Sequence, residues 1–121
     1  MASASSKTFD AADEVRTPPK ASVAIVDLGG NKVARLMLEP GWRWSESIKP
    51  IVGTDRCQAH HLGVLVSGSM HVVGADGIEY EIGPGTAYTI EPGHDAWTVG
   101  DTPVVAFEFD SSAAANYAIP Q

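Results

Sequence analysis

The chain has 121 residues, of which 44% are hydrophobic and 19% charged, a composition that fits one globular domain and excludes a disordered chain. The formal net charge of −7 repels phosphate backbones, which argues against nucleic acid as a partner. No apolar run approaches the length of a membrane span, and the N-terminal segment lacks the apolar core of a secretory signal. A single cysteine, Cys57, cannot form an internal disulfide. These features predict a cytoplasmic protein with no membrane partner.

The first half of the chain predicts an arm followed by strands. Residues 1–20 are small and polar and end in a Pro-Pro pair, which is typical of a loose arm or an edge segment. The β-branched and aliphatic runs at 22–28 and 32–38 flank the sequence Gly-Gly-Asn, which predicts a hairpin. Tryptophan alternates with polar residues at 42–46, as in a strand with one buried face, and 47–55 has the turn residues of a loop.

Turn signals become regular in the second half, where short apolar runs alternate with Gly- and Pro-rich turns. Such a pattern predicts an all-β protein built as an antiparallel sandwich or barrel. The sequence at 111–118 is Ala-rich and permits one helical turn, too short to be stable alone. The predicted organisation is an N-terminal arm over 1–20, one β-domain over 21–110 and a C-terminal tail over 111–121. The predicted strands are 57–67, 69–73, 78–82, 86–90, 94–99 and 104–109.

The spacing of two sequence segments resembles the two motifs of the cupins, which are small jelly-roll barrels. The run Val-Leu-Val-Ser-Gly ends at Gly68 as the first motif does. Five residues separate Gly85 from Glu91-Pro92-Gly93, which is the spacing of the second motif with its proline moved by one place. The segments GWRWSE, CQAHH and PGHDAW together resemble a subgroup of small single-domain cupins. The resemblance covers roughly 22–109. It implies an antiparallel double-stranded β-helix, or jelly-roll barrel, and a homodimer whose edge strands are covered.

The metal-ligand positions of the cupin pattern carry other residue types in this chain. They fall on Asp55, Cys57, His61 and Ala96, and the final asparagine position is Gly100. The resemblance places the face that carries Cys57 and His61 inside the barrel, so His60 points outward. In a regular strand Cys57 and His61 lie about 13 Å apart, and shared ligation therefore requires a bend.

A metal site is one hypothesis for these residues. His94 lies two places before Ala96 and shares its face in a regular strand, and Glu46 offers a carboxylate. His61, His94 and Glu46 form a two-histidine, one-carboxylate set, which suits non-haem iron, whereas a Cys57 thiolate shifts the preference toward zinc or copper. The expected cofactor is a divalent metal ion, with Zn, Fe, Mn, Ni and Cu all open.

Each candidate ligand also has a plainer interpretation. Cys57 can be a small buried hydrophobe, and His61 a hydrogen-bonded core histidine. His94 can cap the turn before it, and Glu46 can be solvated. A nucleophilic cysteine would need a histidine and an orienting acid, and no family-specific cysteine signature is visible.

Aromatic residues provide the case for an organic ligand. In so small a barrel some of them must line the open end, and Trp44, Tyr88 and Trp97 are the expected wall of a ligand pocket. The first hypothesis is therefore a small-molecule-binding or sensing protein. The alternative is a metal-dependent enzyme, such as a dioxygenase, isomerase or lyase, that acts on a small polar metabolite. A third is an interaction module that uses the barrel alone.

Overall fold

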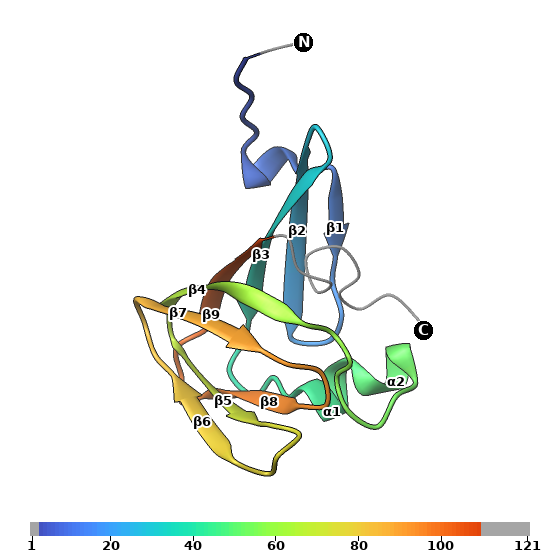
Figure 1. Cartoon of the computed structure of the whole chain (residues 1–121), viewed down its shortest axis with the longest axis vertical. Coiled ribbons are helices and arrows are strands. Elements are labelled where there is room, and N and C mark those ends of the chain that lie inside the picture. Colours follow the sequence, from blue (N-terminus) through green and yellow to red (C-terminus); the bar gives the residue numbers. More distant parts are fainter. Residues whose placement is uncertain (1–2, 110–121) are drawn as a thin grey trace.

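A computed structural model describes residues 3–109 and shows two antiparallel β-sheets packed against each other (Figure 1). The all-β prediction is therefore confirmed, although no strand pairing joins the two sheets into a closed barrel within the described residues. The tail over 111–121, with its expected helical turn, lies outside the described residues. No helix in the described part is long and apolar enough to cross a membrane.

The larger sheet has six strands in the order β1-β2-β3-β9-β4-β7. All of its neighbouring strands are antiparallel, and β9 lies at its centre between β3 and β4. The predicted hairpin forms β2 and β3, and the predicted strands at 86–90 and 104–109 have the bounds of β7 and β9. The six strands are β1 (Glu14–Arg16), β2 (Ala21–Leu28), β3 (Asn31–Leu38), β9 (Val104–Phe109), β4 (His61–Ser67) and β7 (Thr86–Ile90).

The smaller sheet has three strands in the order β6-β5-β8 and faces the inner side of the larger one (Figure 1). Alternation along each strand buries one face: Leu36 and Leu65 from the large sheet pack in one cluster with Met70 and Val72 from the small one. This shared core fixes the register of both sheets, because a one-residue slip would expose it. The three strands are β6 (Glu79–Ile82), β5 (Ser69–Val73) and β8 (Asp95–Val99).

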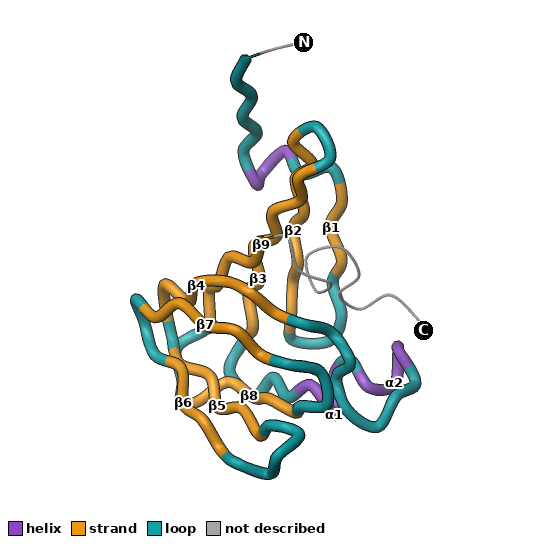
Figure 2. Tube along the Cα trace, viewed as in Figure 1, coloured by secondary structure: helices purple, strands orange, loops and turns teal. Residues whose placement is uncertain are grey.

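The predicted strand at 42–46 is wrong, since Trp44–Ser47 form a short helix, α1, followed by α2 over Lys49–Val52 in the expected loop (Figure 2). An acidic side chain from β8 accounts for the difference. Asp95 accepts a hydrogen bond of 3.2 Å from the Ser45 backbone N–H in the first turn of α1, where a negative charge is stabilising. The helix also buries the Trp44 side chain, which is 2% exposed.

The N-terminal segment adds an edge strand to its own chain. Short helix η1 (Phe9–Ala11) packs with Phe9 against Phe107, and β1 then pairs with β2. Asp13 tethers the segment by accepting a hydrogen bond of 2.7 Å from the Asp27 N–H. β1 therefore forms one edge of the six-stranded sheet, which agrees with the edge-segment interpretation of this part of the chain.

A pair of leucines on β4 tests the burial pattern. Leu65 is 0% exposed and Leu62 is 46% exposed. We expect Leu65→Ala to lower the free energy of unfolding by about 2–5 kcal/mol, because it leaves a cavity in the core. Leu62→Ala is the matched control and should change it by less than about 0.5 kcal/mol. Urea unfolding measures both, and equal losses would contradict the alternation.

Candidate metal centre

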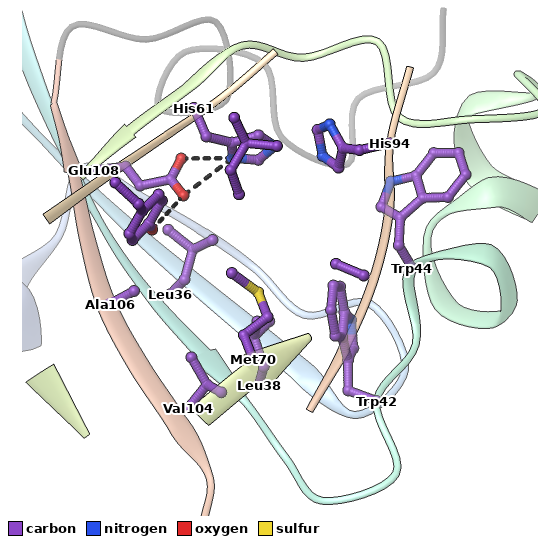
Figure 3. Close-up of a pocket in the computed structure, with 13 residues that line it drawn as sticks. Leu36, Leu38, Trp42, Trp44, His61, Met70, His94, Val104, Ala106 and Glu108 are labelled. Carbon is purple, nitrogen blue, oxygen red and sulfur yellow. Dashed lines mark hydrogen bonds and ion pairs between the residues drawn. The ribbon is translucent and has the colours of Figure 1, made fainter. Parts of the chain in front are cut away.

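Three buried side chains meet between the two sheets. Cys57, His61 and His94 each offer a ligand atom, and these atoms all lie within 4.8 Å of one another. Each of the three residues is at most 6% exposed. Figure 3 shows the two histidine rings facing each other across the top of an apolar interior.

The backbone explains how residues 57 and 61 approach each other. Cys57 forms an isolated bridge with His94: its N–H donates to the His94 carbonyl at 2.8 Å, and the Gly93 N–H donates to the Cys57 carbonyl at 2.7 Å. The intervening residues 58–60 are not in a strand, so the chain bends before β4 begins at His61. The expected continuous strand from residue 57 is thus wrong, and the Cys57 Sγ lies 3.7 Å from the His61 Nε2.

His61 is oriented by a buried carboxylate that the sequence analysis missed. Its Nδ1 lies 2.8 Å from Glu108 Oε1, and the Tyr88 hydroxyl donates to Glu108 Oε2 at 2.7 Å (Figure 3). With Nδ1–H donating to the carboxylate, Nε2 is the ring nitrogen directed toward Cys57. Metal-binding histidines are commonly held in this way by an acceptor behind the ring.

His94 is held by the same device with a different acceptor. Its Nδ1 lies 2.7 Å from the Glu91 carbonyl oxygen, which leaves Nε2 as the ring nitrogen available for the cluster. The His61 and His94 rings meet edge to face, with centroids 4.9 Å apart. His94 therefore fixes the turn, as its plainer interpretation has it, and also joins the cluster. His60 points outward and lies 3.1 Å from Thr89 Oγ1, as predicted.

The electrostatics of the cluster favour a thiolate. Burial raises the pKa of the Cys57 thiol, but hydrogen bonds with His61 and His94 and their positive charge outweigh it and lower the pKa to about 6. Burial also lowers the pKa of His61, whereas the Glu108 carboxylate and the Cys57 thiolate outweigh it and raise that pKa. A thiolate is the form of cysteine that binds metals.

The other expected site residues are distributed over three places. Glu46 is exposed on α1 and is not part of the cluster, because its strand is a helix. Trp44 and Tyr88 line the interior cavity below the cluster. Trp97 lies on the outer face of β8, stacked on His71 of β5 with ring centroids 4.7 Å apart, and does not line that cavity.

Glu108 could have been found from the period of β9. Val104, Ala106 and Glu108 alternate with Val105, Phe107 and Phe109, which places the carboxylate on the inner face. Glu108 is 1% exposed, and a carboxylate is rarely buried so deeply without a partner. An acidic residue at a core position of an apolar strand is thus the signal for a buried histidine opposite.

The interior cavity beneath the cluster is small. It measures about 20 Å³, enough for about one ordered water molecule. Its walls are largely apolar and include Leu36, Leu38, Met70 and Trp42. A ligand of metabolite size does not fit inside this interior.

The comparisons with solved structures identify the architecture. The chain is similar to a sugar phosphate isomerase of the cupin superfamily from Silicibacter pomeroyi, with 16% identity and a TM-score of 0.60, covering 87% of this chain and 74% of that one. It is also similar to ectoine synthase from P. lautus, with 12% identity and a TM-score of 0.60, covering 87% and 77%. This chain has the cupin fold.

A third similar structure covers the whole length. It is a protein of unknown function from Rhizobium leguminosarum, with 16% identity and a TM-score of 0.61, covering 99% of this chain and 100% of that one. No protein-family model matches the sequence, and no curated protein matches it. The cupin resemblance read from the sequence is thereby confirmed for the fold. Cupin-fold structures at this low identity include enzymes and proteins of unknown function, so the activity has to be argued from the site.

Gly63 lies where β4 runs closest to Glu108. A Cβ at this position would lie 2.3 Å from the Phe107 carbonyl oxygen and 2.9 Å from Glu108 Cγ. We expect Gly63→Ala to lower the free energy of unfolding by about 1–3 kcal/mol through overpacking. Gly83→Ala is the matched control, since its Cβ would meet no atom within 4 Å, and it should be nearly neutral. Thermal or urea unfolding measures both, and a neutral Gly63→Ala would contradict the close approach.

Proposed function

We propose that this protein is a small-molecule-binding or sensing cupin that holds a divalent metal ion on Cys57, His61 and His94. The observation that carries the proposal is the buried convergence of one sulfur and two imidazole nitrogens within 4.8 Å. Its support comes from the two acceptors, Glu108 and the Glu91 carbonyl, that fix both rings with Nε2 available. The structure thus favours the metal-site interpretation over three unrelated core residues.

The donor set favours a particular group of metals. One thiolate and two imidazoles are softer than the oxygen ligands that magnesium, calcium and manganese prefer, and they suit zinc or copper. The iron set that included Glu46 has lost its carboxylate, because Glu46 is exposed on α1. Glu108 does not replace it, since its two oxygens are engaged by His61 and Tyr88.

A metal-dependent enzyme is the second candidate. Three protein ligands leave a fourth position open on zinc, which is the arrangement of catalytic sites. The interior cavity of about 20 Å³ has room for water there but not for a metabolite. A substrate of metabolite size would therefore have to separate the two sheets to reach the ion, and this requirement argues against turnover at this centre.

Variants of the three ligands test the metal site. After loading with Zn²⁺ or Co²⁺, we expect the wild-type protein to hold the ion, and His61→Ala and His94→Ala to lose most of it, because each removes one of three ligands. Cobalt absorption reports sulfur ligation directly, so Cys57→Ala should abolish the sulfur-to-cobalt charge-transfer band. Elemental analysis after gel filtration measures occupancy.

The matched control is His60→Ala, the neighbouring histidine that points outward. It should retain full occupancy and the same cobalt spectrum. If His61→Ala also retains full occupancy, or if the wild type takes up neither ion, the proposed metal site is refuted.

We further propose that the protein is a cytoplasmic homodimer. Support for the dimer comes from three large apolar side chains exposed on neighbouring strands of the six-stranded sheet: Met37 on β3, Phe109 on β9 and Val66 on β4. They are between 39% and 45% exposed. Burying such a surface against a second copy would stabilise an association.

Light scattering tests the dimer. The wild type should scatter as twice the chain mass of 12.7 kDa, and Val66→Lys should scatter as the monomer, because it places a charge in the interface. Ile78→Lys is the control, since Ile78 is 56% exposed on another part of the surface and should leave the dimer intact. A wild type that is monomeric at micromolar concentration contradicts the proposal.

A further inference from the structure

A second and much larger cavity lies where the two sheets separate. β6 is the edge of the small sheet and β7 the edge of the large one, and they diverge from the turn at 83–85 (Figure 1). The cleft between them measures about 560 Å³. Cavities of roughly 300–1,000 Å³ are the usual size for metabolite sites.

Side chains on the core faces of both strands are left uncovered in this cleft. Tyr80 pairs with Val72 across β6 and β5 and therefore points to the same inner side. Val72 is 2% exposed, whereas Tyr80 is 46% exposed, because no strand lies opposite it. Thr86 is exposed in the same way, although its cross-strand partner Leu65 is fully buried. The cleft is therefore an unfilled part of the inner space between the sheets.

The chemistry of the cleft is aromatic and acidic. Tyr80 and Tyr88 provide ring surface, and Ile82 provides an apolar floor. Asp76, Glu81 and Glu91 also line it, and no lysine, arginine or histidine does. Outside the lining, His71 lies 3.9 Å from Glu81 and His60 lies 3.7 Å from Glu91. Of the three, Asp76 is the carboxylate for which the described residues show no ion pair. Asp76 is held at one end of the aromatic wall, where the Tyr80 hydroxyl donates to it at 2.9 Å.

Asp76 is ionised at neutral pH. Hydrogen bonds from the Ile78 backbone N–H and the Tyr80 hydroxyl lower the pKa of its carboxyl group. An ammonium group placed at this end of the cleft would meet the Asp76 carboxylate, which attracts cations, beside the Tyr80 side chain.

We propose that the cleft between β6 and β7 binds a small organic cation with a flat apolar body, its ring against Tyr80 and Tyr88 and its charged end toward Asp76. The ligand class follows from three features: a metabolite-sized volume, the uncovered Tyr80 ring on a core face, and the Asp76 carboxylate, which has no ion-pair partner among the described residues. The site stands apart from the metal centre and does not depend on a metal being bound. Tyr88 and Ile90 line both spaces and separate the cleft from the interior cavity.

The test uses two probes that share one ring and differ in charge. The ¹⁵N-labelled full-length protein, treated with a chelator, is titrated with phenethylamine and, separately, with phenylacetate. Phenethylamine should shift the amide signals of Ala75, Tyr80 and Thr86 saturably in the millimolar range. Phenylacetate should leave them unshifted, because the carboxylates repel it.

Variants separate the aromatic and the charged contributions. Tyr80→Ala should weaken phenethylamine binding roughly threefold to tenfold through loss of ring contact. Ile78→Ala, on the same hairpin and outside the cleft lining, is its control and should not. Glu91→Gln should weaken binding about twofold at low salt, while Glu39→Gln, an exposed carboxylate elsewhere, should not.

Three outcomes would overturn the proposal. The first is no saturable shift of the cleft amides with phenethylamine. The second is equal binding of phenylacetate, which would remove the charge selection. The third is a shift of the cleft amides with protein concentration alone, which would make the cleft an interface between copies of this chain.

Discussion

The hydrogen bond between Glu108 and His61 is the interaction on which the interior depends. A carboxylate that is 1% exposed costs several kcal/mol in a protein core unless it is paired and hydrogen-bonded. Here one oxygen accepts from His61 and the other from Tyr88, so the group is satisfied on both sides. The same contact orients the His61 ring and directs its second nitrogen at Cys57. One buried pair therefore both permits the charge in the core and orients the candidate metal ligand.

The cluster also requires the backbone to depart from regular strand geometry. Cys57 and His61 would be about 13 Å apart on a straight strand. Because residues 58–60 leave the strand, Cys57 can pair with His94 and still place its sulfur 3.7 Å from His61 Nε2. The absence of a side chain at Gly63 then leaves room for Glu108 behind the histidine. Irregular backbone at a site, held by regular strands on either side, is how a rigid fold positions reactive groups.

The strands were predictable because their apolar alternation is local, as the bounds of β5, β7 and β9 show. The alternation placed Cys57 and His61 on one face, and the cupin resemblance placed that face inside. The helix α1 was missed because burial of Trp44 suits a strand or a helix equally, and the deciding contact comes from Asp95, fifty residues away. Glu108 was missed for a related reason, since its partner lies 47 residues earlier in the chain. Sequence patterns report which face is buried, whereas pairings between distant polar groups depend on strand order, which they do not encode.

The two cavities share a wall, and this limits how strongly they can influence each other. Tyr88 lines the cleft on one side and donates to Glu108 on the other. A ligand in the cleft can change the metal affinity only if it binds more tightly when the Tyr88 ring is in one position than in another. The link passes through one hydrogen bond to a charged acceptor, worth about 1.5–3 kcal/mol. Coupling by this route therefore cannot exceed roughly a hundredfold in affinity. It is also reciprocal: the factor by which a cleft ligand changes the metal affinity is the factor by which the metal changes the affinity of the cleft ligand.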